Sequence, residues 1–284
     1  MTIDLAAARE FIYANARLLD RHRAAVLFDG APADLVVQTV RAYHNADGGF
    51  GHALEPDVRT PHSETTAALH GLEVLAEVDA LDDPMVKDVA GWVARHADPD
   101  GGVPFVLQTA MDYPRGPWMV PSDGGSHLTF GLAAILDAAE VHSPWLDSAK
   151  HWCWTRIEQP AELSAYWVKF ALDFLDGAAD ESRASAAFDR LRPLLRADGS
   201  VPVPGGTAEE KLTPLTLSPR ARSRSRSLFT EEQITADLNA LEAGQQDDGG
   251  WTFDFLGWSP GQTAEWRGLT TLRSLATLLA NDGL

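Results

Sequence analysis

The stretch LEAGQQDDGGW at residues 241–251 decides the fold. Apolar residues at helical spacing (Ile234, Leu238 and Leu241) lead into it, and an aspartate and two glycines end it. Glycine takes the left-handed backbone conformation without steric cost, and aspartate accepts hydrogen bonds from nearby backbone amides. The stretch therefore predicts a helix that ends in a tight turn.

The same pattern recurs along the chain. Asp-Gly-Gly, once varied to Asp-Gly-Ser, begins at positions 47, 100, 198 and 248, which are 53, 98 and 50 residues apart, while a copy at 123–125 is out of phase. A unit of about 50 residues holds two helices and two connections. Strand-like alternation is nearly absent. The sequence predicts one all-α domain over residues 1–284, a stack of about eleven helices paired into hairpins.

Two segments need separate interpretation. Residues 1–28 mix apolar and charged side chains, which predicts an amphipathic helix and not a signal peptide. Residues 201–228 contain four prolines, so we expect a long irregular loop in place of one helix.

Composition limits the range of functions. With 23 Lys+Arg against 41 Asp+Glu, the net charge is −18, which argues against a nucleic acid partner. The single cysteine, Cys153, excludes an internal disulfide framework and any multi-cysteine metal site. No apolar run is long enough to cross a membrane. We expect a soluble cytoplasmic protein, and the sequence leaves its oligomeric state open.

The repeat also resembles a known family. The motif and its echo read Leu241-x3-Gln245-x3-Gly249-Gly250-Trp251 and Val40-x3-His44-x3-Gly48-Gly49-Phe50. They resemble the glutamine-tryptophan repeat of triterpene (squalene) cyclases and the Gln-x3-Gly-Gly-(Phe/Trp) repeat of protein prenyltransferase β subunits. The resemblance implies a divergent member of the terpenoid cyclase/protein prenyltransferase superfamily, whose fold is the α/α toroid. Another α/α barrel, such as a sugar-processing one, is the alternative for the fold.

The family's catalytic motifs are not found in this chain. Class II terpene cyclases carry Asp-x-Asp-Asp as proton donor, and the nearest string here, Asp98-Pro99-Asp100, runs into a glycine turn. Prenyltransferases bind zinc through an aspartate two residues before a cysteine, where this chain has His151. We therefore expect metal-independent chemistry without a cofactor.

Three long loops leave the glycine turns, at 51–61, 103–121 and 252–261, and loops gathered at one end of a barrel are usually its functional mouth. The first is rich in acid and base groups, so we expect the proton donor to be Glu55, Asp57 or Glu265, with His52 or His127 as partner. Structural roles are the alternative. Asp57 and Arg59 would form a pair, Glu64 would cap the next helix, and His62 would be exposed.

Aromatic and basic side chains on the same loops are the candidate ligand-binding residues, because aromatic faces suit an apolar or cationic ligand. They are Arg59, Tyr113, Trp118, Trp258, Trp266 and Arg267. For Glu265 and Arg267 a helix-end ion network is the alternative. The arginines at 220, 222, 224 and 226 would grip a diphosphate or lie in a solvated loop.

The resemblance implies an enzyme of secondary metabolism that acts on an apolar small molecule, with isoprenoids as one candidate class, in an apolar central chamber. A non-catalytic ligand-binding protein and a glycan-active barrel enzyme are the alternatives. We expect Glu55 or Asp57 to point into that chamber.

Overall fold

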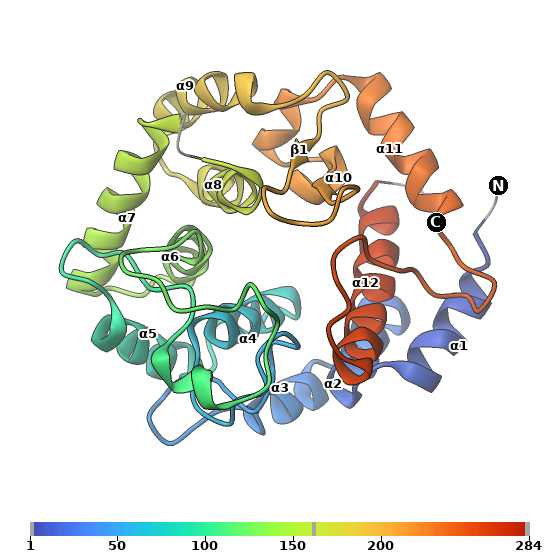
Figure 1. Cartoon of the computed structure of the whole chain (residues 1–284), viewed down its shortest axis with the longest axis horizontal. Helices are drawn as coiled ribbons and strands as arrows, with labels where there is room; N and C mark the ends of the chain where they lie inside the picture. Colours follow the sequence, from blue (N-terminus) through green and yellow to red (C-terminus); the bar gives the residue numbers. More distant parts are fainter. Residues whose placement is uncertain (1–2, 161–162, 282–284) are drawn as a thin grey trace. The chain divides into compact units, whose positions relative to one another are not determined.

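The computed structural model describes residues 3–160 and 163–281, and helices account for most of them (Figure 1). The α-helices are α1 (Leu5–Asn15), α2 (Leu18–Asp29), α3 (Asp34–Arg41), α4 (Thr65–Glu77), α5 (Pro84–His96), α6 (Leu128–Ala138), α7 (Pro144–Ile157), α8 (Ala165–Gly177), α9 (Glu181–Leu191), α10 (Pro214–Leu217), α11 (Glu231–Ala243) and α12 (Pro260–Ala280). Short 3-10 helices are η1 (Gln108–Asp112), η3 (Arg192–Leu194) and η4 (Arg224–Leu228). The two strands, β1 (Val201–Pro202) and β2 (Lys211–Leu212), form one antiparallel pair.

The chain divides into two compact units. Unit 1 combines Met1–Ala24 with Arg156–Leu284, and unit 2 is Ala25–Thr155. A single domain over residues 1–284 and an apolar central chamber stay predictions.

The glycine turns share one backbone geometry. In the first turn the Asn45 N–H donates to the Gly49 carbonyl at 2.8 Å, and the Gly48 N–H donates to the Asn45 carbonyl at 3.0 Å. The same pair of bonds closes the turns at 98–102, 196–200 and 246–250. The aspartate of each turn also accepts the backbone N–H two residues later. The repeat found in the sequence is therefore a repeat of structure.

Three of the turns dock on a further helix in the same way. A Cβ on Gly48, whose φ is +90°, would lie 2.9 Å from the Asp88 carbonyl oxygen of α5, and one on Gly249, whose φ is +86°, would lie 2.4 Å from the Ala7 carbonyl oxygen of α1. The second glycine of a turn then packs on an aromatic ring four residues further along that helix, in the pairs Gly49–Trp92, Gly102–Trp152 and Gly250–Phe11. Glycine is needed because the turn approaches the helix backbone.

Helices that leave the turns form a second layer. In unit 2, α4 packs against α6 on one side and against α3 and α5 on the other, and residues 65–72 of α4 are all buried. In unit 1, α12 packs against α1, and α8 packs against α9. This pairing of helices into two layers is the all-α, α/α toroid class that the sequence predicts.

Two predictions about local structure need correction. Residues 1–28 contain two helices and not one, because Ala16 is extended and packs against Gly268 of α12. Within residues 201–228 there is no long helix, as expected, but the segment is not wholly irregular: it holds the β1–β2 pair, α10 and η4. The Asp176 carboxylate of α8 fixes η4 by accepting the Ser225 N–H at 2.7 Å and the Ser225 hydroxyl at 2.8 Å.

Candidate functional site

The first long loop, predicted over residues 51–61, extends to residue 64 in the structure and is held by backbone hydrogen bonds at both ends. The Glu64 N–H donates to the Phe50 carbonyl at 2.9 Å, and the Ala53 N–H donates to the Thr60 carbonyl at 3.2 Å. Leu54, with no exposed surface, anchors the loop between these bonds. Its acidic side chains are therefore held on a fixed backbone.

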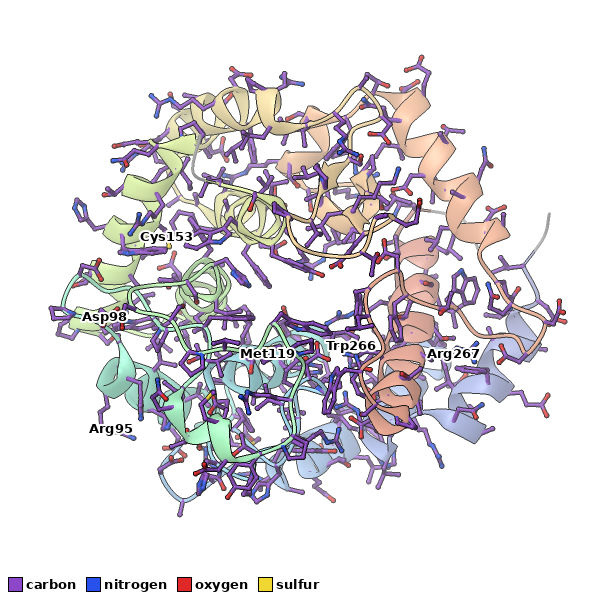
Figure 2. All side chains as sticks on the ribbon, viewed as in Figure 1. Arg95, Asp98, Met119, Cys153, Trp266 and Arg267 are labelled. Atoms are coloured by element: carbon purple, nitrogen blue, oxygen red, sulfur yellow. The ribbon has the colours of Figure 1, made fainter. Side chains whose placement is uncertain are left out.

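The second long loop lies on the first. The Arg59 N–H donates to the Pro114 carbonyl at 2.9 Å, and the Gly116 N–H donates to the Asp57 carbonyl at 2.8 Å. An apolar cluster fills the space beneath, made of Val58, Val106, Ala110 and Met119 with Phe105 and Trp118 packed against it (Figure 2 labels Met119). We call residues 105–119 the cover segment.

The cover segment donates two hydrogen bonds to a buried carboxyl group. Glu64 is 1% exposed; its Oε2 accepts the Leu107 N–H at 2.9 Å and its Oε1 accepts the Thr109 hydroxyl at 3.1 Å. Burial raises the pKa of Glu64 to about 7, although the hydrogen bonds from Leu107 and Thr109 oppose the rise. Glu64 occupies the N-cap position of α4, but its side chain makes no capping bond. At pH 7 a carboxyl group with this pKa is protonated in about half of the molecules, whereas an ordinary glutamate is almost fully ionised.

A second acid lies near the next turns of α4. The Glu55 Oε2 is 3.4 Å from the His70 Nδ1, and their side chains are 13% and 4% exposed. His70 follows Glu64 by six residues, which is about 9 Å along a helix axis. The structure thus pairs Glu55 with His70, a histidine outside the predicted set, while His52 or His127 as partner of the proton donor stays a prediction.

The other candidates of unit 2 lie around this pair of loops. Asp57 is buried at 4% exposure, and Arg59 is half-buried. His52 is exposed and shares a 2.9 Å hydrogen bond with the Asn45 Oδ1. The Tyr113 hydroxyl is 3.2 Å from the Nε2 of His62, which is exposed as expected. The ring centre of His127 lies 5.1 Å from that of Phe105. Trp118 packs against the apolar cluster.

The remaining candidates belong to unit 1. Trp258 and Arg267 line a pocket of about 600 Å³ between α1 and the start of α12. Arg267 donates two hydrogen bonds to Asp248, at 2.8 and 2.9 Å, and its guanidinium lies 4.7 Å from the centre of the Phe11 ring. Trp266, labelled in Figure 2, meets Phe255 edge-on with 5.2 Å between the ring centres, and Glu265 is half-buried. A single site shared with the residues of unit 2 stays a prediction.

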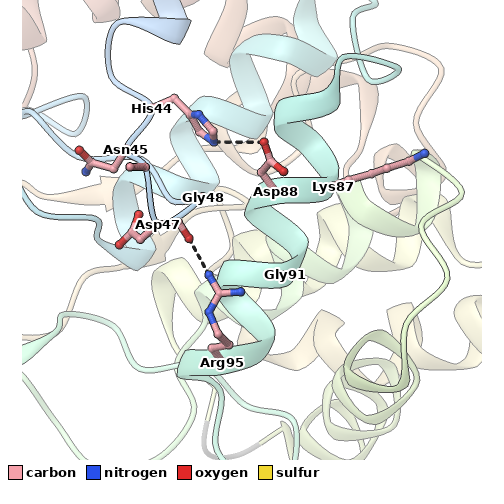
Figure 3. Close-up of a pocket in the computed structure, with 9 residues that line it drawn as sticks. His44, Asn45, Asp47, Gly48, Lys87, Asp88, Gly91 and Arg95 are labelled. Atoms are coloured by element: carbon pink, nitrogen blue, oxygen red, sulfur yellow. Dashed lines mark hydrogen bonds and ion pairs between the residues drawn. The ribbon is translucent and has the colours of Figure 1, made fainter.

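A polar pocket of about 470 Å³ lies beside the first glycine turn, between that turn and α5 (Figure 3). The Arg95 guanidinium closes one end by donating to the Asp47 carbonyl at 2.6 Å. At the other end the His44 Nε2 faces Asp88 at 3.9 Å. Nothing in the sequence pointed to this pocket.

The described residues contain no group of three or more His, Cys, Asp and Glu side chains arranged to hold a metal ion. Cys153 is buried on α7 (Figure 2), and burial raises the pKa of its thiol well above the ordinary value. Among residues 3–160 and 163–281, none of the helices has the length and apolar composition needed to cross a bilayer.

Solved structures with this architecture span nearly the whole chain. A protein from Actinoplanes superposes with a TM-score of 0.63 at 15% identity, covering 98% of both chains. Variants of the type II terpene cyclase MstE from Scytonema are also similar to this chain. One, in complex with geranylgeranyl dihydroxybenzoate, has a TM-score of 0.56 at 14% identity and covers 98% of this chain and 97% of its own. Another, with the product merosterolic acid A, has a TM-score of 0.59 at 13% identity and covers 97% and 95%.

The fold is terpene cyclase-like. At this level of identity the likeness extends to the fold alone. No protein-family model matches the sequence, and no curated protein matches it either.

Two residues of this site were not chosen from the sequence. Glu64 was considered only as a cap of the next helix, and its donors come from residues 107 and 109, which no local pattern links to it. His70 is the only ionisable residue in the buried run 65–72 of α4. A titratable side chain inside an otherwise uncharged stretch of helix is the signal that could have found it.

Proposed function

We propose that this protein is a terpene-cyclase-like enzyme that begins its reaction by protonating an apolar small molecule from the Glu64 carboxylic acid. The buried Glu64 carboxyl, with a pKa near 7, is the observation that supports this proposal. A carboxylic acid that keeps its proton near neutral pH is suited to general acid catalysis.

The chemistry follows from the groups around Glu64. The Glu64 O–H bond breaks, the π electrons of a substrate alkene form the new C–H bond, and a carbocation and the Glu64 carboxylate result. The Leu107 N–H, the Thr109 hydroxyl and the N-terminus of α4 stabilise that carboxylate. A second alkene of the same molecule closes a ring by attacking the cation. Loss of a proton to the Glu55–His70 pair ends the reaction.

The substrate class is proposed from the surroundings of the acid. The cover segment brings Phe105 and Trp118, whose ring faces stabilise positive charge. The terpene cyclase MstE binds a geranylgeranyl dihydroxybenzoate, which is a prenylated aromatic molecule. We take an isoprenoid or prenylated molecule as the substrate here, with Arg59, Tyr113, Trp258, Trp266 and Arg267 as its further contacts. Asp57, Glu265, His52 and His127 remain candidates for other proton transfers.

The test is to incubate the protein with geranylgeranyl dihydroxybenzoate, with linear polyenes and with prenyl diphosphates, each with EDTA or with Mg²⁺. We expect a cyclised product of unchanged mass by mass spectrometry, formed in the presence of EDTA. Glu64→Gln should abolish it, and Glu55→Gln or Asp57→Asn should abolish it with little change in melting temperature. Glu10→Gln on the exposed face of α1 is the matched control.

Other outcomes would contradict the proposal. Full turnover by Glu64→Gln would show that Glu64 is not the acid. Tight binding of these molecules without product would favour a ligand-binding protein. Cleavage of a glycan would favour the barrel enzymes that use paired carboxylates.

A further inference from the structure

The cover segment presents one side chain to the Glu64 carboxyl. Thr109 lies in η1, and its hydroxyl donates to the Glu64 Oε1 at 3.1 Å. The neighbouring Ala110 has no exposed surface, and its N–H donates to the Leu107 carbonyl at 3.1 Å. This buried anchor fixes the turn and with it the position of the Thr109 hydroxyl.

The two donors on Glu64 differ in what they can do. A backbone N–H such as that of Leu107 only donates, so the acidic proton cannot lie between it and Oε2. A hydroxyl donates and accepts, so Thr109 can donate to the carboxylate and accept from the protonated acid. A substitution at position 109 can remove the hydroxyl donor. A substitution at position 107 cannot remove the backbone N–H, because every residue except proline has one.

We propose that Thr109 is a positioning residue that orients the Glu64 carboxyl in both of its protonation states. The proposal rests on the proposed function for its effect on turnover, but the contact can be tested without turnover. Removing the hydroxyl takes a hydrogen bond from the charged form of Glu64, which makes the proton harder to release.

Other charged groups lie on the same elements and are engaged elsewhere. Arg115 of the cover segment donates to the carbonyls of Met119, Met111 and Tyr113. His62 contacts Tyr113, and His70 contacts Glu55. Asp57 and Arg59 pair through their backbones with the cover segment, and Asp112 is exposed at the end of η1. The hydrogen bonds that shift the pKa of Glu64 come from Leu107 and Thr109.

The experiment compares Thr109→Val, which keeps the shape and loses the hydroxyl, with Thr109→Ser, which keeps the hydroxyl. Thr155→Val is the matched control, because Thr155 is exposed and its hydroxyl bonds only to the His151 carbonyl of its own helix. Infrared difference spectra give the Glu64 titration from the carboxylic C=O band, which Glu64→Gln assigns. We expect about a tenfold rise in proton affinity for Thr109→Val and wild-type values for Thr109→Ser and Thr155→Val.

Kinetics give the second readout. Activity requires protonated Glu64, so it falls as pH rises through the Glu64 pKa, and in Thr109→Val that fall should occur about 1 pH unit higher. Its plateau kcat should drop while KM is unchanged, and Thr109→Ser should restore both. An unshifted Glu64 titration in Thr109→Val, or an equal shift in Thr109→Ser, would overturn the proposal. A shifted titration in a protein that turns over no substrate would instead overturn the proposed function.

Discussion

The first and the last glycine turns have the same backbone, but their aspartates bind different partners. Asp47 accepts neutral donors, the Ser63 hydroxyl at 2.7 Å and the Trp92 indole N–H at 3.1 Å. Asp248 accepts two hydrogen bonds from the Arg267 guanidinium. Ser63 lies next to Glu64, the N-cap residue of α4, and Arg267 lies on α12, so in both cases the aspartate binds a residue of the segment that follows its turn. The repeat therefore specifies the backbone and the task of the aspartate, while the chemistry of the partner varies.

The polar position of the motif differs as well. The Gln245 amide nitrogen donates to the carbonyls of Asp4 and Gly249, and its oxygen accepts the Asp4 N–H. His44, at the same position of the first repeat, meets Phe50 edge-on at 5.2 Å and Asp88 at 3.9 Å. A bridge between the turn and the helix it docks on is present in the last repeat, whereas the polar pocket of Figure 3 lies at the corresponding place in the first.

The largest effect is expected from the glycines, where the two turns are alike. Gly249→Ala should destabilise the protein by about 4 kcal/mol, because the new Cβ meets the Ala7 carbonyl and the positive φ is strained. Gly48→Ala should cost less, since its closest atom is 2.9 Å away and not 2.4 Å. Urea denaturation measures both. Gly261→Ala, with open space around it, is the control, and equal losses at all three positions would contradict the docking argument.

The helices that follow the two turns begin with different residues. This difference predicts that the start of α4, and not that of α12, makes stability depend on pH. α12 begins with the neutral cap Ser259, whereas Glu64 precedes α4 with its pKa raised from 4.5 to about 7 by burial. The folded state thus holds the proton more tightly than the unfolded chain. The contribution of Glu64 to the free energy of unfolding is complete below pH 4.5. It falls by up to about 3 kcal/mol as pH rises to about 7. Denaturation at pH 5 and pH 8 should show this loss in the wild type and a smaller one in Glu64→Gln; equal losses would disprove it.

The aspartates give the smallest effect and the sharpest contrast. Burial alone would raise the pKa of Asp47, but the hydrogen bonds that it accepts from Gly49, Ser63 and Trp92 outweigh burial and lower it. Hydrogen bonds from Arg267 lower the pKa of Asp248. Asp47→Asn should lower the free energy of unfolding by about 1.5 kcal/mol at any salt concentration. The amide NH2 cannot accept the hydrogen bonds that the carboxylate accepts, and the donors that lose their acceptor are uncharged. Asp248→Asn should cost about 0.5 kcal/mol at low salt and less at 0.5 M NaCl, since its ion pair is half-exposed. If the stability loss of Asp47→Asn also decreased at 0.5 M NaCl, the two aspartates would not differ in the way proposed.

The sequence predicts well what local interactions decide. Apolar spacing and glycine turns are properties of short segments, so the helix predicted to lead into residues 241–251 is present as α11. The Glu64 contacts join positions 43 and 45 residues apart, and the Glu55–His70 contact depends on how the loop folds back on α4. The β1–β2 pair was missed for a different reason, because each strand has 2 residues and is too short to show an alternating pattern.

The docking of the last turn on α1 has a consequence for folding. Two other turns dock on the helix of the next repeat, but Gln245 and Asp4 are 241 residues apart, so their contact closes a loop that contains most of the chain. Contacts of such long sequence separation form late, because the entropy of closing the loop is lost before any contact compensates for it. In native-state hydrogen exchange, the amides of α1 and of residues 246–250 should therefore open together as one cooperative unit, ahead of those in α4.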